Sequence, residues 1–193
     1  MKMKSAQIIK HYLILLLFPL IISCQNPGRT DYKYTEQETA AFLNDITKYA
    51  GASISSYTES KKALTNEFYI TTRYPLSKPQ LEEYKKNNGT VHNKTDDISD
   101  FTSYTVKDYE LLNEKNEKLQ FADNGQATYL QEMNLVEYDK ILFQNLGIEV
   151  KLNKQFEKLK GSITVEFEMP GNIRRTAKIP VNISIYDEAP ESF

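Results

Sequence analysis

Two segments near the C-terminal end of the chain alternate apolar and polar residues with a period of two. The apolar positions of the first segment are Ile163, Val165, Phe167 and Met169, and those of the second are Ala177, Ile179, Val181, Ile183 and Ile185. This alternation is typical of strands that have one buried and one wet face. Pro170, Gly171 and Asn172 lie between the segments and form a turn signal. The pattern therefore predicts an antiparallel β-hairpin.

The alternation also restricts the register of this hairpin. Apolar residues can lie opposite apolar residues only if the residue numbers of each pair have an even sum. Among such registers we prefer the one that places Glu166 beside Lys178 and Phe167 beside Ala177, because it joins opposite charges. Pro180 has no backbone N–H to donate, so we expect its strand to lie at a sheet edge or to carry a bulge there.

A different spacing, of three and four residues, follows Thr35. Thr35 and Glu38 have the form of a capping box, which predicts a helix start. The apolar residues that follow at this spacing are Phe42, Leu43, Ile46, Tyr49 and Ala50. They predict an amphipathic helix of about four turns, and Ile54, Tyr57 and Leu64 would extend its apolar face to about residue 64.

Between these regions the pattern predicts several shorter elements. Residues 67–74 favour a strand that ends at Pro75, and Ser77 with Pro79 favours a short helix that stops near Asn88. We expect a loop over residues 90–100.

The next stretch predicts a hairpin and one further strand. Residues 101–112 and 118–121 flank a polar connection of the kind found in hairpins. Residues 126–146 fit either a helix or a strand. Gly147 then interrupts the pattern, and residues 148–152 alternate as a strand does.

Together these elements predict an α+β fold. We expect an N-terminal amphipathic helix followed by a mainly antiparallel β-sheet, and a small β-sandwich is one arrangement that would serve the C-terminal end. Residues 35–193 have the length and apolar content of a single domain.

The first 24 residues have the features of a secretory leader. Lysines occur at positions 2, 4 and 10, an apolar run covers residues 12–22, and Ser23 precedes Cys24. The run is too short to span a bilayer, which needs roughly 20 apolar residues. The end of this segment resembles the lipobox of bacterial lipoproteins. The resemblance implies that residues 1–23 are a signal peptide, that Cys24 is lipidated, and that residues 24–34 are a tether.

The resemblance also implies a location and a membrane partner. Several acyl chains on Cys24 would anchor the chain stably, whereas one chain binds only marginally. Gln25 follows the cysteine, where lipoproteins retained in the inner membrane of some Gram-negative bacteria carry Asp. Surface-displayed lipoproteins of another bacterial group often carry an acidic run just after the cysteine, whereas no acidic residue follows Cys24 before Asp31. We therefore expect the outer membrane and its periplasmic face.

The net charge of the chain without its leader restricts the classes of partner. Removal of the leader's three lysines leaves 21 basic against 26 acidic residues, a net charge of −5. A mildly acidic body argues against nucleic-acid binding, which depends on a basic face that neutralises phosphates. Residues 96–123 hold eight acids and three lysines, whereas residues 151–178 hold seven basic residues and three glutamates. These segments would pair within the fold or meet a partner, and we favour the first alternative.

Two groups of residues are candidates for a catalytic or a metal site. His92 with Asp96, Asp97 and Asp100 has suitable ligand atoms, but the segment lacks the spacing of zinc or calcium sites, so we expect an exposed acidic loop. Glu166 and Glu168 share one face of a strand. Paired-carboxylate catalysis would start from such a pair, but glutamates that alternate with a clean apolar face are most simply solvent-facing.

Other catalytic motifs are missing from the sequence. Ser53 lacks the second glycine of a nucleophile elbow, no glycine-rich phosphate loop occurs, and Cys24 is the only cysteine. We expect no catalytic residue, cofactor or metal. Arg174, Arg175 and Lys178 form a basic cluster that is either a solvated turn, which we favour, or a contact for lipid head groups or an acidic partner.

Three functions fit this pattern. The first is a non-catalytic, lipid-anchored binding or assembly module of the cell envelope, with an envelope protein as partner. The second is an immunity or inhibitor lipoprotein that blocks an incoming toxin through the acidic residues 96–123. The third is an envelope enzyme that uses carboxylates, which would require buried acids converging in a cleft.

Overall fold

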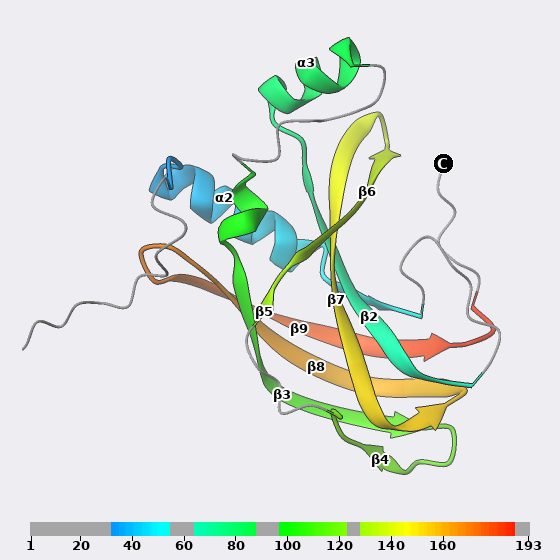
Figure 1. Cartoon of the computed structure of the whole chain (residues 1–193). Coiled ribbons are helices and arrows are strands. Elements are labelled where there is room, and N and C mark those ends of the chain that lie inside the picture. The colour runs from blue at the N-terminus through cyan, green and yellow to red at the C-terminus, as the bar shows by residue number, and fades with distance from the viewer. Residues whose placement is uncertain (1–31, 55–63, 88–96, 123–127, 188–193) are drawn as a thin grey trace, which may run out of the picture. The chain divides into compact units, whose positions relative to one another are not determined.

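Two antiparallel sheets form most of the protein. The computed structural model describes residues 32–54, 64–87, 97–122 and 128–187, and those from Lys33 onward belong to one compact unit. Every strand ladder in this part of the chain is antiparallel, and two α-helices accompany the sheets (Figure 1). The α+β class and the mainly antiparallel sheet predicted from the sequence are therefore confirmed.

The first sheet, sheet A, has the strand order β1-β2-β7-β6. Its strands are β1 (Gly51–Ser53), β2 (Thr65–Pro75), β6 (Gln131–Tyr138) and β7 (Ile141–Phe156). The second sheet, sheet B, has the order β4-β3-β8-β9, and β5 pairs with β3 outside this path. Its strands are β3 (Ser103–Asn113), β4 (Lys118–Leu119), β5 (Thr128–Tyr129), β8 (Lys158–Met169) and β9 (Ile173–Ser184).

The C-terminal hairpin confirms that paired residue numbers have an even sum, but its register is not the one that we preferred. All partners of β8 and β9 have an even sum, yet Glu166 lies opposite Thr176, and Lys178 lies opposite Thr164. The reason is the turn, which closes after Met169 and puts the positive φ angles of 83° and 58° on Gly171 and Asn172. These two residue types adopt that conformation most easily. The observed register joins a different pair of opposite charges, Glu168 and Arg174, which lie 3.0 Å apart.

Pro180 lies on an edge strand, where its missing backbone N–H deprives no further strand of a hydrogen bond. It faces Ser162 in the ladder of β9 with β8, and β9 is an edge of sheet B. The prediction of an edge strand at Pro180 is confirmed.

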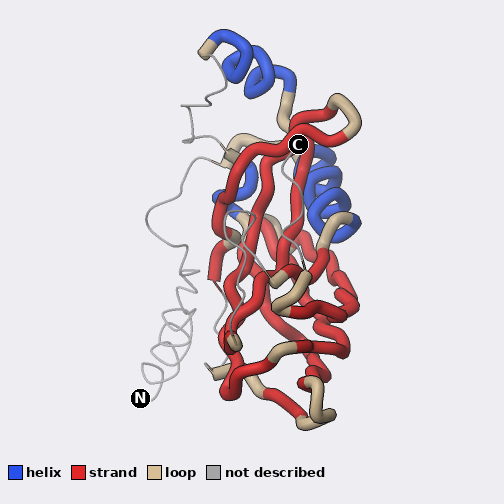
Figure 2. The backbone as a smooth tube through the Cα atoms, turned by 90° about the vertical axis from the view of Figure 1, so that its right-hand side faces the viewer, coloured by secondary structure: helices blue, strands red, loops and turns tan. Residues whose placement is uncertain are grey.

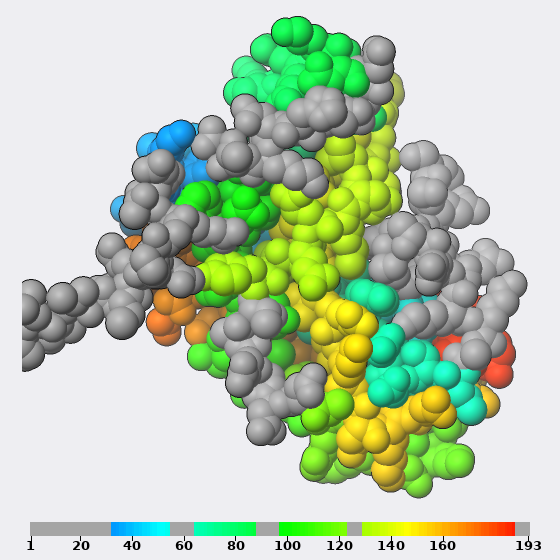
Figure 3. Space-filling view, in the orientation of Figure 1, coloured from blue at the N-terminus to red at the C-terminus, as the bar shows by residue number. Residues whose placement is uncertain are grey.

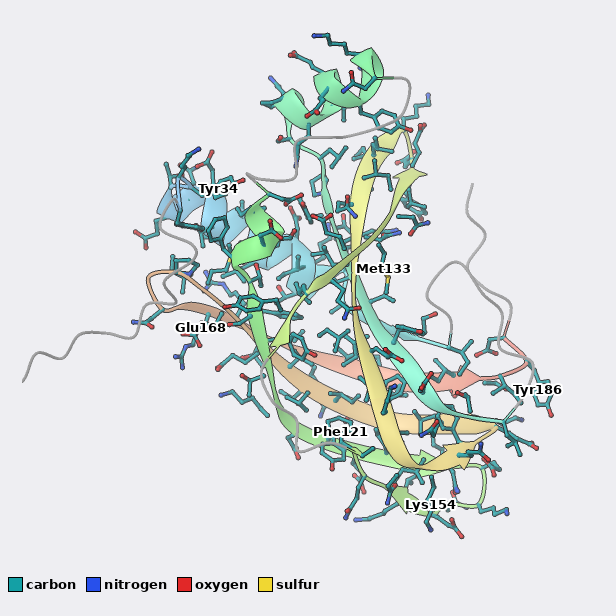
Figure 4. The ribbon with its side chains drawn as sticks, in the orientation of Figure 1. Tyr34, Phe121, Met133, Lys154, Glu168 and Tyr186 are labelled. Atoms are coloured by element: carbon teal, nitrogen blue, oxygen red, sulfur yellow. The ribbon has the colours of Figure 1, made fainter. Side chains whose placement is uncertain are left out.

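The core is built from the alternate residues of both sheets. Its buried members in β2 and β7 include Phe68, Ile70, Leu146, Ile148, Val150 and Leu152, and those in β8 and β9 include Ile163, Val165, Phe167, Ala177, Ile179 and Val181. The two sheets are also joined directly, because only Glu157 separates β7 from β8. A second junction pairs Phe121, after β4, with Leu152 of β7, and Figure 4 shows Phe121 and Lys154 at this end of the strands.

Helix α2 (Glu36–Lys48) begins where the predicted capping box places it. The Thr35 hydroxyl accepts from the Glu38 backbone N–H, and Glu38 accepts from the Thr35 N–H at 2.8 Å. Its buried face contacts sheet A, where the Thr72 hydroxyl donates to the Ile46 carbonyl at 2.6 Å. The expected continuation to residue 64 is wrong, because the chain turns into β1 at Gly51 and residues 55–63 lie outside the described part.

Helix α3 (Lys78–Lys86) follows β2, as predicted. Ser77 caps it in a second capping box with Gln80, and Pro79 lies in its first turn. None of its residues is buried, and Figure 2 shows it at one end of the strands. No helix in the described residues is both long and apolar enough to span a membrane.

The middle of the chain differs from the prediction in two places. A short 3₁₀ helix, η2 (Ile98–Phe101), occupies the end of the expected loop. The ambiguous residues from Thr128 onward are strands, and β7 runs straight through Gly147. Gly147 does not end the strand because its missing side chain makes room for Met133 of β6: a Cβ there would lie 2.0 Å from the Met133 Cε atom. The predicted hairpin of β3 and β4 is confirmed.

Candidate functional site

The register of sheet A places an arginine beside uncharged residues of the neighbouring strand. Arg73 of β2 lies opposite Asn145 of β7, and Thr71 lies opposite Gly147. Because side chains alternate between the two faces of a sheet, Arg73 points away from the face on which Thr72 contacts α2. We call the side of sheet A on which Arg73, Asn145 and their neighbours lie the Arg73 face.

Three aromatic rings surround the Arg73 guanidinium. Its Cζ atom lies 4.7 Å from the ring centre of Tyr49, 4.7 Å from that of Tyr138 and 5.0 Å from that of Phe143. Tyr49 and Phe143 also contact each other edge to face, with ring centres 5.6 Å apart. Each cation–π contact contributes ~0.5–1 kcal/mol at a partly exposed site. The rings come from the end of α2, the end of β6 and the start of β7, so the fold assembles this group from distant parts of the chain.

Arg73 has no acidic partner among the described residues. None of the ion pairs formed there includes it, and its Nε atom is buried without a hydrogen-bond partner. A buried, unpaired donor costs about 1–3 kcal/mol. The guanidinium therefore retains donors for an acceptor that these residues do not supply.

A bulge in β6 fixes the neighbouring part of the Arg73 face. The ladder of β6 with β7 shifts between Glu132 and Leu135, so Met133 and Asn134 have no ladder partners. Gln144 donates from its side chain to the Met133 carbonyl at 2.8 Å, and Asn145 donates to the Asn134 side-chain oxygen at 3.2 Å. Figure 4 shows Met133 where β6 crosses β7. The side-chain amides of Gln144 and Asn145 therefore form hydrogen bonds with the two bulged residues, and neither of these bonds involves Arg73.

The turn between β6 and β7 carries exposed apolar residues beside Arg73. Tyr138 and Ile141 face each other across it and are 57% and 49% exposed. Asp139 and Lys140 form the two-residue turn with φ angles of 50° and 64°, which matches a tight hairpin turn. Atoms of β6 and of this turn lie at the surface below α3 (Figure 3). The site thus combines Arg73 with an exposed turn in which Tyr138 and Ile141 flank the charged residues Asp139 and Lys140.

No protein-family model matches this chain. No curated protein and no solved structure matches it significantly either.

The predicted exposed acidic loop is wrong at Asp97, which is 6% exposed. Its carboxylate accepts hydrogen bonds from the Tyr74 hydroxyl, from the Ser99 N–H and hydroxyl at 3.1 Å each, and from the Gln80 side chain at 3.4 Å. Burial, and then the Asp97 charge, raise the pKa of Tyr74 above its ordinary value. This network fastens η2 to β2 and α3.

Glu166 and Glu168 are engaged by cations. Lys107 donates to Glu166 at 2.8 Å, and Arg174 lies 3.8 Å from Glu166 and 3.0 Å from Glu168. The Lys107 hydrogen bond holds the pKa of Glu166 below its ordinary value. A general acid needs a raised pKa, so Glu166 has the wrong electrostatics for acid catalysis.

Several residues of the basic cluster and of the acidic segment form ion pairs or hydrogen bonds within the fold. Arg174 pairs with the two glutamates, and Arg175 donates to the Asn44 side chain at 3.3 Å, while Lys178 is exposed. In the acidic segment, Glu117 pairs with Lys154 at 3.3 Å. This pair joins the acidic and basic segments as expected.

Glu114 of the same segment binds backbone instead of a cation. It accepts from the Glu157 and Lys158 N–H groups at 3.1 and 3.4 Å. The turn between β3 and β4 is thereby fastened to the junction of β7 and β8.

Several predicted residues lie outside the described part of the chain. They are Cys24, His92 and Asp96. Ser53 lies in β1, and no group of three potential metal ligands occurs among the described residues. The sequence pattern did not single out Arg73, because its rings are far from it in the chain. The available signal was a basic residue inside an apolar strand.

Proposed function

We propose that this protein is a lipid-anchored cell-envelope lipoprotein that acts as a non-catalytic binding or assembly module. The observation that carries the binding role is Arg73, a cation preorganised by aromatic rings and without an acidic partner among the described residues. Arginine and tyrosine are typical of residues that dominate protein interfaces. The anchor is supported by the lysines, the apolar run and Cys24 of the leader.

The state of the acids supports a non-catalytic role. Asp97 is enclosed by donors, and Glu166 and Glu168 are paired with cations. The same observations weaken the alternative of a carboxylate enzyme. For the immunity alternative, the acidic segment would be the contact surface, but Asp97, Glu114 and Glu117 have partners within the fold.

In its finer form, the architecture that we propose is an N-terminal amphipathic helix followed by two sheets that make a small sandwich at the C-terminal end. Its support is the burial of alternate residues in both sheets and of one helix face. The sandwich would present the Arg73 face on the side of sheet A opposite Thr72, and residues 24–34 would hold this body off the outer membrane at its periplasmic side.

Cys24→Ser tests the anchor directly. We expect the wild-type chain in the membrane fraction with the added mass of lipid, and the variant in the soluble fraction without it, because acylation requires the thiol. Ser23→Ala keeps a small residue before the cysteine and is the matched control, which should remain lipidated. Unchanged membrane retention of Cys24→Ser, with no lipid-dependent mass lost, would refute the proposed anchor.

A further inference from the structure

We propose that Arg73 binds a carboxylate group carried on an apolar moiety, with Tyr138 and Ile141 as the apolar contact. This inference rests on the proposed binding function and names the chemistry of its ligand. The starting observation is the contact set of Arg73: ring centres at 4.7, 4.7 and 5.0 Å from Cζ, and no ion pair among the described residues.

The contacts hold the cation in place without using its hydrogen-bond donors. A guanidinium presents five N–H donors in one plane, and ring faces attract its charge without acting as conventional acceptors in that plane. Arg73 is only partly buried, and of its nitrogens only Nε is both buried and unpaired. A ligand that accepts hydrogen bonds would therefore meet an arginine side chain whose conformation the fold has already fixed.

A carboxylate fits this cation better than other anions do. It is planar and singly charged, and it accepts two parallel hydrogen bonds from a guanidinium. Polyphosphates and nucleic acids would need several cations, whereas Asn145 and not a second cation lies opposite Arg73. On the same face of the sheet, Lys151 already pairs with Glu67 at 3.3 Å.

The apolar part of the ligand is inferred from the neighbouring turn. Tyr138 contacts Arg73 with one side of its ring and is nevertheless more than half exposed, and Ile141 lies opposite it. Exposed aromatic and aliphatic groups beside a charged anchor are typical of recognition sites. A carboxylate attached to an aromatic or aliphatic group would cover them when it pairs with Arg73.

The test uses the full chain, purified in detergent with ¹⁵N-labelled arginine. The probes are N-acetylphenylalanine, its neutral amide and inorganic phosphate, followed through the Arg73 Nε–Hε resonance in millimolar titrations. We expect the acid to shift this resonance saturably and the amide to leave it unchanged. Equal shifts from acid and amide, or equal binding of phosphate, would overturn the proposal.

Variants then separate charge from geometry. Arg73→Lys keeps the positive charge but loses the planar fork, so we expect about tenfold weaker binding of the acid. Arg174→Lys, at a cation that pairs with glutamates, is the matched control and should bind as the wild type does. Unchanged affinity in Arg73→Lys would refute the inference, and the wild-type titration tests it even if this variant does not fold.

Two further arms identify the source of the carboxylate and isolate the inference. A longer peptide that ends in the same residue should bind at least ~tenfold tighter than the free acid if the ligand is part of a protein; equal binding would assign a small acid. Cys24→Ser should keep acid binding whatever happens to its membrane association. Failure of binding with intact anchoring would refute only the carboxylate site, and chemical turnover of a probe would refute only the non-catalytic role.

Discussion

The Arg73 face of sheet A and the outward face of sheet B treat charge in opposite ways. On sheet B, Glu166 meets Lys107 and Arg174, and Glu168 meets Arg174 again. On sheet A, Arg73 contacts three rings and no carboxylate among the described residues. Ion pairs therefore neutralise Glu166 and Glu168 of sheet B, as they do Lys151 of sheet A, whereas Arg73 has no carboxylate partner among the described residues.

The two central strands show the same contrast in their packing. Gly161 of β8 lies under the backbone of β3, and a Cβ there would be 1.8 Å from the Glu110 carbonyl oxygen. Gly147 of β7 lies under the side chain of Met133, which is flexible. In sheet B, rigid backbone packs against Gly161 and ion pairs join the strands. On the Arg73 face, the Met133 side chain packs against Gly147, and this side chain is able to rearrange.

The largest effect is expected when this difference in packing is tested. Gly161→Ala should lower the free energy of unfolding by about 3 kcal/mol or more, because the residue has a φ of +140° and the added methyl group meets backbone. Gly147→Ala, its counterpart in sheet A, should cost about 1 kcal/mol, since the Met133 side chain is free to turn away. Urea unfolding measures both, and equal losses would contradict the contrast between the two faces.

A smaller effect is expected at the two arginines. Arg73→Met loses three cation–π contacts of ~0.5–1 kcal/mol each, but it also removes an unpaired buried Nε that costs about 1–3 kcal/mol, so the two terms should largely cancel and stability should change by about 1 kcal/mol or less. Arg174→Met removes its partly exposed ion pairs and should cost at most about 0.5 kcal/mol. Thermal and urea unfolding provide the measurement. A loss of several kcal/mol in Arg73→Met would show that Arg73 serves stability rather than binding.

The sequence predicted the regions whose strands have one wet face. In β8 and β9, polar residues alternate with the core, so the hairpin, its parity and its edge at Pro180 followed from local pattern. Residues 142–148 of β7 are buried on both faces, which removed the alternation and left this segment ambiguous. Gly147 resembled a break because the Met133 side chain that fills its space comes from another strand.

The candidate site could not be predicted for a related reason. Arg73 acquires its surroundings from Tyr49, Tyr138 and Phe143, and only the register of sheet A and the path of the chain after α2 bring these together. The preferred charge pairing of the hairpin failed similarly, since the partner of Glu166 is Lys107 on β3. Local patterns carry information about which face is buried, but not about which distant side chain meets a given charge.

The smallest expected effect concerns the pH dependence of that pair. The Lys107 hydrogen bond lowers the pKa of Glu166 from its usual 4.5, and the Arg174 charge contributes less. A lowered pKa in the folded state means that the pair stabilises the fold above pH 4.5, and that this contribution is lost as the pH falls through the folded value. Lys107→Gln should therefore raise the pKa of Glu166 towards 4.5, as measured by carboxyl NMR titration. Lys178→Gln, opposite Thr164 in the observed register, should leave it unchanged, and a shift in that variant would contradict the register itself.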